Sequence, residues 1–313
     1  MQQSPSLDEA RLMLAADERH MPAGLYRRAS RRELIRVRPG VYASAEWWSG
    51  LRPHERYRQR VAAAARVFPD AVFMRESAAS IHELPTFGEP RDIHIFDPDR
   101  RTTKRFGDVV VHATQTPRDV VRIDSWCATD LTATVVDTAR HLPPAYALAV
   151  VDAALRRGLG RAHLRDWSLR DSNRRHERML AWVWDFADPL AESAGESVSR
   201  AVISWLGFAV PVLQQVFTFE GITDRSDFWW PHVRAIGESD GYGKYVALTA
   251  QAAVNRVVRE KVREDRLRRY SDGFARWDWA DTHLVLPVER KLLRAGVPLV
   301  ASRDNAMLAT LRR

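Results

Sequence analysis

Apolar residues recur with a helical period in several long stretches of the chain. Residues 53–67 carry an alanine-rich face, and residues 131–141 and 145–156 form two apolar segments separated by Pro143-Pro144. This spacing is typical of helices that bury one face, and the prolines mark the boundary between two of them. The same pattern predicts further helices at residues 7–16, 28–34, 77–84, 173–186, 192–206, 250–270 and 288–294.

Between these helices lie short runs of β-branched and aromatic residues that indicate strands. Residues 35–42 alternate apolar and polar side chains around Pro39-Gly40, a combination typical of a β-hairpin with a tight turn. Other strand-like runs lie at residues 92–96, 108–112, 120–123, 214–220, 225–230, 235–239 and 274–279. Helices and strands together predict a fold of the α/β class with a mixed α+β organisation.

The length of the chain, 313 residues, is more than one hydrophobic core usually serves, so we expect several domains. Two short helices followed by a basic hairpin predict a winged helix-turn-helix domain at residues 1–50. Residues 51–170 have the pattern of a middle α/β domain. Residues 171–313 change character, with long charged helices and a second set of strands, and are expected to form a third domain.

The composition is that of a globular protein, with 45% apolar and 28% charged residues. No apolar run approaches the roughly 18–20 residues that cross a bilayer, and residues 1–10 lack the basic-then-apolar pattern of a secretion signal. The single cysteine, Cys127, cannot form an internal disulfide and offers no cysteine cluster for zinc. We therefore expect a cytoplasmic protein without a membrane partner.

The formal net charge of +8 permits an acidic partner such as nucleic acid. Only four of the 48 basic residues are lysines, an imbalance that the codon usage of a GC-rich genome also explains. The distribution of charge is more informative, because a basic cluster at residues 27–32 directly precedes the hairpin. This cluster favours DNA binding by the N-terminal domain, and the alternative is a structural hairpin with solvated arginines.

Four acidic residues form a candidate site in the domain expected at residues 171–313. Glu196 lies on a predicted helix, Asp227 on a predicted strand, and Glu238 and Asp240 end the next strand. Carboxylates from a helix and two adjacent strands can converge on one Mg²⁺ ion, which prefers oxygen ligands. Such an ion polarises a phosphodiester and lowers the pKa of a bound water, so that a nucleophile forms at neutral pH. Solvated surface carboxylates would show the same spacing.

Five segments around these acids follow one another in a specific order, at residues 195–200, 227–231, 237–241, 259–267 and 276–279. In this order they resemble the PD-(D/E)XK nuclease superfamily, and most closely its very-short-patch-repair-like endonuclease domains. The resemblance covers about residues 171–285. It implies a restriction-endonuclease-like core, in which helices flank a mixed sheet, and a Mg²⁺ or Mn²⁺ cofactor.

Residue by residue, the resemblance implies that three acids bind the metal and take part in catalysis. Glu196 would be the acid of the helix, Asp227 the central ligand and Glu238 the acid of the second strand. Asp240 stands where the superfamily pattern has a lysine, although an Asp-Gly pair is usual there in the domains that look closest. The departure leaves open whether the domain cleaves DNA.

Two lysines are candidates to replace the missing ammonium group. Lys244 and Lys261 follow the acids in the chain, and either would orient the attacking water or stabilise charge that develops on the phosphate. Ordinary surface charge is the alternative for both.

The N-terminal half resembles the AbiEi-type antitoxin family, on the segments at residues 34–42, 76–85 and 153–158. This resemblance covers about residues 10–165. The family consists of predicted transcriptional regulators in type IV toxin–antitoxin loci of phage defence, so double-stranded DNA and a cognate toxin are the implied partners. Six arginines would face the DNA: Arg27, Arg28, Arg31, Arg32, Arg36 and Arg38.

The preferred function is that of a DNA-binding protein with a metal-dependent, endonuclease-like C-terminal domain, in phage defence or a toxin–antitoxin locus. The alternative is a non-catalytic AbiEi-like antitoxin and transcriptional autorepressor, and a third possibility is a nuclease that acts on RNA. The middle domain has no carboxylate cluster, nucleophile motif or glycine-rich phosphate loop. We therefore expect structural roles for His82, His94 and His112.

Overall fold

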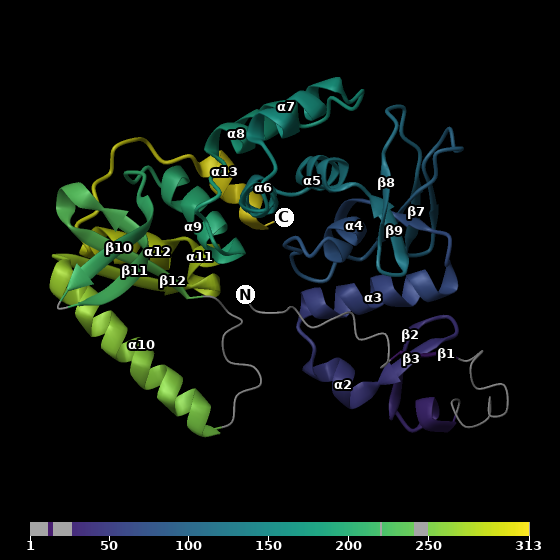
Figure 1. The fold of residues 1–313 in the computed structure, drawn as a ribbon, viewed down its shortest axis with the longest axis horizontal. Coiled ribbons are helices and arrows are strands. Elements are labelled where there is room, and N and C mark those ends of the chain that lie inside the picture. Colours follow the sequence, from purple (N-terminus) through teal and green to yellow (C-terminus); the bar gives the residue numbers. More distant parts are fainter. Residues whose placement is uncertain (1–11, 15–26, 220, 241–249, 313) are drawn as a thin grey trace. The chain divides into compact units, whose positions relative to one another are not determined.

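The computed structural model describes residues 12–14, 27–219, 221–240 and 250–312, and the chain divides into two compact units. The first unit contains the residues up to Thr138 together with Ala162–Arg175, and the second contains Ala139–Arg161 together with the residues from His176 onward. Each unit combines helices with β-sheet (Figure 1), so the predicted mixed α/β class is confirmed. Among the described helices, none is long and apolar enough to cross a membrane.

A three-stranded antiparallel sheet occupies the N-terminal part of the first unit. Its strands stand in the order β1 (Met13–Leu14), β3 (Val41–Ser44) and β2 (Leu34–Arg38), and α2 (Ala45–Gly50) follows β3. β2 and β3 form the predicted hairpin. Gly40 takes the positive φ of +80° that favours glycine in such a turn.

Of the two short helices predicted in this region, the one at 7–16 is wrong where the structure describes it, and the one at 28–34 is confirmed only at its start. Within the range 7–16, Met13–Leu14 is a strand because it pairs with β3, and residues 7–11 and 15–16 lie outside the described residues. Within the range 28–34, only residues 28–30 are helical, and Leu34 already belongs to β2. Strand pairing therefore outweighs the local helical spacing here.

The remainder of the first unit is a six-stranded mixed sheet with helices against it. The predicted strands at 92–96, 108–112 and 120–123 are confirmed, whereas three further strands of two to four residues were not predicted. The sheet order is β6 (Lys104–Phe106), β7 (Val109–His112), β5 (Ile93–Phe96), β4 (Val72–Phe73), β9 (Trp126–Thr129) and β8 (Val120–Ile123). The helices are α3 (Pro53–Val67), α4 (Arg75–Ile81), α5 (Leu131–Ala139) and α7 (Arg161–Arg170).

The second unit is built on a four-stranded mixed sheet. Its order is β10 (Val212–Phe219), β11 (Ile222–Trp230), β12 (Ala235–Asp240) and β13 (Gly273–Asp278). The first three strands are antiparallel neighbours, and β13 returns parallel to β12 after the long helix α10 (Ala250–Tyr270). The other helices are α6 (Pro144–Arg156), α8 (Glu177–Phe186), α9 (Ala194–Trp205), α11 (Trp279–Leu284), α12 (Leu286–Arg294) and α13 (Asn305–Ala309), with short 3-10 turns at Pro231–Val233 and Thr310–Arg312.

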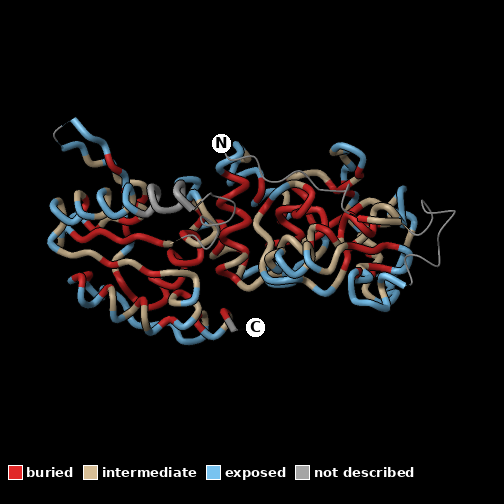
Figure 2. The backbone as a smooth tube through the Cα atoms, turned by 90° about the horizontal axis from the view of Figure 1, so that it is seen from below, coloured by how far each residue is buried: buried red, intermediate tan, exposed pale blue. Residues whose placement is uncertain are grey.

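Helix α6 is a central part of the second unit. It packs against α8 and α9, and Asp152 at its middle accepts a hydrogen bond of 3.0 Å from Arg200 of α9. Both side chains are buried, and burial raises the pKa of Asp152 to about 6. Such buried residues form the interior of each unit (red in Figure 2). Residues 139–161 therefore lie on the other side of the domain boundary expected at residue 170.

Candidate functional site

The two faces of the C-terminal sheet carry different chemistry. Gly237 of β12 lies opposite Phe228 of β11, and a Cβ atom at Gly237 would lie only 2.8 Å from the Trp277 ring. Phe228 also stacks on Trp277, with 5.4 Å between ring centroids. Because side chains alternate along a strand, this aromatic layer leaves the next residue, Glu238, on the opposite face. That face lies toward α10 and is polar.

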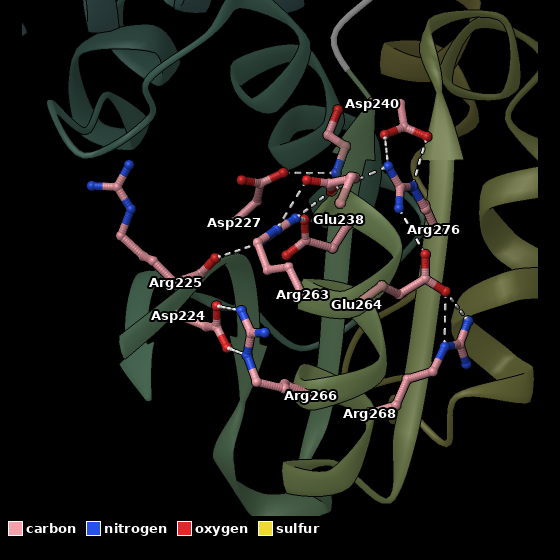
Figure 3. A network of polar contacts seen from close by, with 12 residues as sticks. Asp224, Arg225, Asp227, Glu238, Asp240, Arg263, Glu264, Arg266, Arg268 and Arg276 are labelled. Atoms are coloured by element: carbon pink, nitrogen blue, oxygen red, sulfur yellow. Dashed lines mark hydrogen bonds and ion pairs between the residues drawn. The ribbon is translucent and has the colours of Figure 1, made fainter. Parts of the chain in front are cut away.

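Asp227 and Glu238 lie beside each other on this polar face (Figure 3). The Oδ2 atom of Asp227 accepts a hydrogen bond of 2.8 Å from the backbone N–H of Ser239. Glu238 is buried, with 5% of its surface exposed. Burial, and secondarily the negative charge of Asp227, raise the pKa of Glu238 to about 7. The fold thus holds two carboxyl groups close together although they repel each other.

One oxygen of Glu238 is satisfied and the other is not. Oε2 accepts a hydrogen bond from Nη2 of Arg263, whereas Oε1 is buried and has no hydrogen-bond partner among the residues that the structure describes. A buried polar atom without a partner is costly unless a ligand or water satisfies it. Mg²⁺ is commonly bound by one or two carboxylates together with water and substrate phosphate. The Asp227–Glu238 pair therefore fits a divalent cation.

Arginines surround the two carboxylates, as Figure 3 shows. Arg276 of β13 makes two hydrogen bonds to Asp240, of 2.6 and 2.8 Å, and a third of 2.7 Å to Glu264. Arg266 of α10 makes a similar double contact to Asp224, at 2.7 and 2.8 Å. The acids of this face are thus largely neutralised by the protein itself.

The other residues expected in the site have different surroundings. Glu196 is buried on α9, and its carboxylate accepts hydrogen bonds from the N–H of Glu192 at 2.9 Å and the amide of Gln214 at 2.8 Å. Lys261 is exposed and pairs with Asp265 at 3.6 Å on the surface of α10. Lys244 lies outside the described residues.

The expected ligand set of Glu196, Asp227 and Glu238 is not gathered around one point. Among the residues that the structure describes, no three His, Cys, Asp or Glu side chains are grouped closely enough to hold a metal ion. Glu196 comes from α9, whose Ser199 contacts Ser239 on the aromatic side of β12. The candidate site is therefore formed by the strand acids Asp227 and Glu238.

Sequence reasoning missed Arg263 and Arg276. Both lie in segments that carry the nuclease resemblance, but nothing in those segments pairs Arg276 with Asp240, 36 residues earlier in the chain. The spacing of Glu260 and Arg263 predicts an ion pair within the helix, which the structure contains at 2.8 Å. The second partner of Arg263, Glu238, depends on how α10 packs on the sheet.

The arginines expected to face DNA divide into two groups. Five of them are exposed in the first unit: Arg27, Arg28, Arg31, Arg32 and Arg36. Arg38 is different, because it is buried and makes two hydrogen bonds to Asp108, at 3.0 and 3.3 Å. Its guanidinium also lies over the Phe68 ring. The expectation that Arg38 faces DNA is therefore corrected to a structural role.

Three histidines of the first unit, His82, His94 and His112, have hydrogen-bond partners, and the last two are buried. His94 Nδ1 lies 2.8 Å from His112 Nε2, and its other nitrogen lies 3.3 Å from Glu76. His82 Nε2 lies 2.8 Å from the carbonyl oxygen of Thr129. These contacts agree with structural roles, which remain a prediction.

Comparison with known proteins finds relatives of the chain that have no described function. No family model matches the chain. The chain is 32% identical over 281 residues to the "uncharacterized protein Rv2248" of Mycobacterium tuberculosis strain H37Rv, and the alignment covers 88% of this chain and 94% of the relative. The "uncharacterized protein MT2308" of strain CDC 1551 / Oshkosh matches to the same extent.

Proposed function

The chain belongs to the family of the Mycobacterium tuberculosis protein Rv2248, and we propose that it is a DNA-binding protein whose second unit hydrolyses phosphodiester bonds with Mg²⁺ or Mn²⁺. The single observation that carries the proposal is the buried carboxyl group of Glu238, which lies beside Asp227 and whose Oε1 atom has no hydrogen-bond partner among the described residues. The mixed four-stranded sheet with helices against it supports the proposal, since the nuclease resemblance implies such a core.

The residues of the site suit this chemistry. Asp227 and Glu238 would hold the cation, which supplies charge to the phosphate and a water of lowered pKa when bound. The aromatic layer of Phe228 and Trp277 supports both strands from the other side of the sheet. A rigid layer of this kind keeps the two carboxylates at a fixed separation, which a metal site requires.

The first unit supports DNA binding through its exposed arginines. Arg31, Arg32 and Arg36 lie on or next to β2 and are exposed. Guanidinium groups in such a position bind phosphate oxygens, a contact that does not depend on base sequence. We propose that this hairpin places duplex DNA on the first unit.

The test is a comparison of two aspartate-to-asparagine variants in a plasmid-nicking assay with Mg²⁺ or Mn²⁺. Asp227→Asn keeps the shape of the side chain and removes its charge, so we expect cleavage to fall by a factor of 100 or more, on the order of a lost catalytic interaction. Asp265→Asn removes an exposed carboxylate of α10 and should cleave as the wild type does. Equal cleavage by both variants, or none by the wild type, would reject the nuclease function.

A non-catalytic antitoxin and autorepressor is the second candidate, and one observation favours it. Both strand acids that follow Gly237 have arginine partners within the chain, Arg263 for Glu238 and Arg276 for Asp240. On this proposal the second unit is a scaffold, and the protein binds the operator of its own locus. Specific operator binding without metal-dependent cleavage, together with a neighbouring nucleotidyltransferase-type toxin gene, would favour this function.

A further inference from the structure

Arg263 donates a hydrogen bond to Oε2 of Glu238, one of the two carboxylates that would hold a metal ion. Its side chain is only 25% exposed, and all three of its nitrogens donate hydrogen bonds. Nη2 donates to Glu238, Nη2 and Nε donate to Glu260 at 2.8 and 3.2 Å, and Nη1 donates to the carbonyl oxygen of Arg225 at 2.8 Å. The guanidinium is therefore held by α10, β11 and β12 at once (Figure 3).

We infer that Arg263 is a built-in counter-ion of the Asp227–Glu238 pair, and that a divalent cation must displace it from Glu238 in order to bind. The inference rests on the proposed function, because it assigns a competitor for the same metal site. An arginine keeps its proton under all physiological conditions, so its positive charge can leave Glu238 only by movement. Two cations within a few ångströms of one carboxylate repel each other, and the repulsion is strong where water is excluded.

The structure gives the displaced guanidinium a second partner. Glu260 lies one helical turn before Arg263 and already accepts two of its hydrogen bonds. Releasing Glu238 thus leaves Arg263 paired on the half-exposed surface of α10 and does not create an isolated buried charge. In the absence of metal the arginine balances the negative charge of Glu238. With metal, the same carboxylates exchange one cation for another.

Arg266 provides a matched control on the same helix. It lies one turn after Arg263 and makes a two-bond contact to Asp224, which is on the same strand as Asp227. Arg266→Gln therefore removes an arginine–carboxylate contact of the same kind from the same helix. Its guanidinium has no hydrogen bond to Glu238 among the described contacts, so it should not compete for the metal.

The experiment measures Mn²⁺ binding to the full chain by isothermal titration calorimetry without DNA. Arg263→Gln should bind Mn²⁺ more tightly than the wild type by a factor of about 5 to 150, the usual size of coupling between two bound groups. Arg266→Gln should bind as the wild type does. Arg263→Lys should be intermediate, because an ammonium group keeps the charge but cannot contact Glu238 and Glu260 in the same fork-like way.

Unchanged or weaker Mn²⁺ binding by Arg263→Gln, including no binding at all, overturns the inference. Circular dichroism and thermal melting establish whether each variant is folded. If Arg263→Gln does not fold, Arg263→Lys takes its place, and Mn²⁺ binding by this variant that is no tighter than that of the wild type overturns the inference. The two proposals fail separately. Tighter binding by the Arg263 variant without any DNA cleavage rejects the nuclease function alone, whereas cleavage that depends on Asp227 with unchanged Mn²⁺ affinity rejects only the role of Arg263.

Discussion

Glu238 is a carboxyl group whose titration in the folded protein should be measurable as a change in stability. Its ordinary pKa is 4.5, and burial together with the charge of Asp227 raises it to about 7 in the folded protein. Between these values the folded protein binds more protons than the unfolded chain. The contribution of Glu238 to stability therefore falls as the pH rises from about 4.5 to about 7, by at most about 3 kcal/mol.

Glu238→Gln should remove this pH dependence, since glutamine resembles the protonated acid at every pH. Relative to the wild type, the variant should gain up to about 3 kcal/mol in free energy of unfolding between pH 4.5 and pH 7.5. Urea denaturation of both proteins at the two pH values, in the presence of EDTA, measures this difference. A stability difference that is the same at both values would show that Glu238 is ionised normally in the folded protein.

At the residue scale, the sequence identified the acids better than their partners. Asp227, Glu238 and Asp240 are recognisable because they lie on neighbouring strands within a familiar order of segments. The arginines that pair with these acids are not recognisable from the sequence, because a guanidinium on a long flexible side chain can reach any of several acids. Arg263 pairs with Glu238, 25 residues earlier in the chain, only because α10 packs across the polar face of the sheet.

The hairpin of β2 and β3 shows how one irregularity redirects a side chain. Arg36 and Arg38 are two residues apart, so a regular strand would place both on the same face. The pairing of β2 with β3 shifts its register between these residues, which indicates a β-bulge. Arg36 is consequently exposed, whereas Arg38 is buried against Asp108.

The hairpin predicts opposite effects for the two arginines. Arg38→Ala should lower the free energy of unfolding by about 1.5–3 kcal/mol, because hydrogen bonds to a charged partner are lost. Arg36→Ala should change stability by less than about 0.5 kcal/mol, as is usual at the surface. If the hairpin binds duplex DNA, only Arg36→Ala should lower the slope of log K against log salt concentration, by about one unit.

Urea denaturation and DNA binding at several salt concentrations check the two arginines separately. Loss of DNA affinity in a stable Arg38→Ala protein would contradict the structural role of Arg38. An unchanged salt dependence in Arg36→Ala would contradict contact between this arginine and a phosphate.

At the element scale, long periodic segments were predictable and short ones were not. The limits of α3 (53–67) and α10 (250–270) agree with the sequence pattern, since each is a long helix with a repeated apolar spacing. β4 has only two residues and β6 only three, which is too short for an alternating pattern. β1 was mistaken for a helix because its strand character depends on pairing with β3.

At the scale of the whole molecule, the chain crosses between the two units more than once. Ala139–Arg161 belongs to the second unit, Ala162–Arg175 returns to the first, and His176 begins the rest of the second. The sequence pattern showed two adjacent helices, α5 and α6, but not that they serve different cores. Local periodicity reports which face of a helix is buried, and it contains no information about the partner that buries it.

This arrangement predicts that the second unit depends on α6 for folding. A fragment of residues 171–313, cut at the boundary expected from the sequence, would lack Leu148 and Val151, which are fully buried. Each such side chain contributes roughly 1.5–3 kcal/mol through burial. The fragment would also leave Arg200 without Asp152, and breaking a buried ion pair costs about 3–5 kcal/mol. Together these losses rival the whole stability of a typical domain, about 5–15 kcal/mol.

A fragment of residues 139–313 is the matched control, because it retains α6 and differs only at its N-terminal end. We expect it to unfold cooperatively in urea, with a tryptophan fluorescence transition that coincides with the loss of helical circular dichroism. The fragment 171–313 should show no cooperative transition and should expose apolar surface to a hydrophobic dye. Equal transition midpoints for the two fragments would place the boundary at residue 170 after all, and α6 would then be an accessory of the second unit and not part of its core.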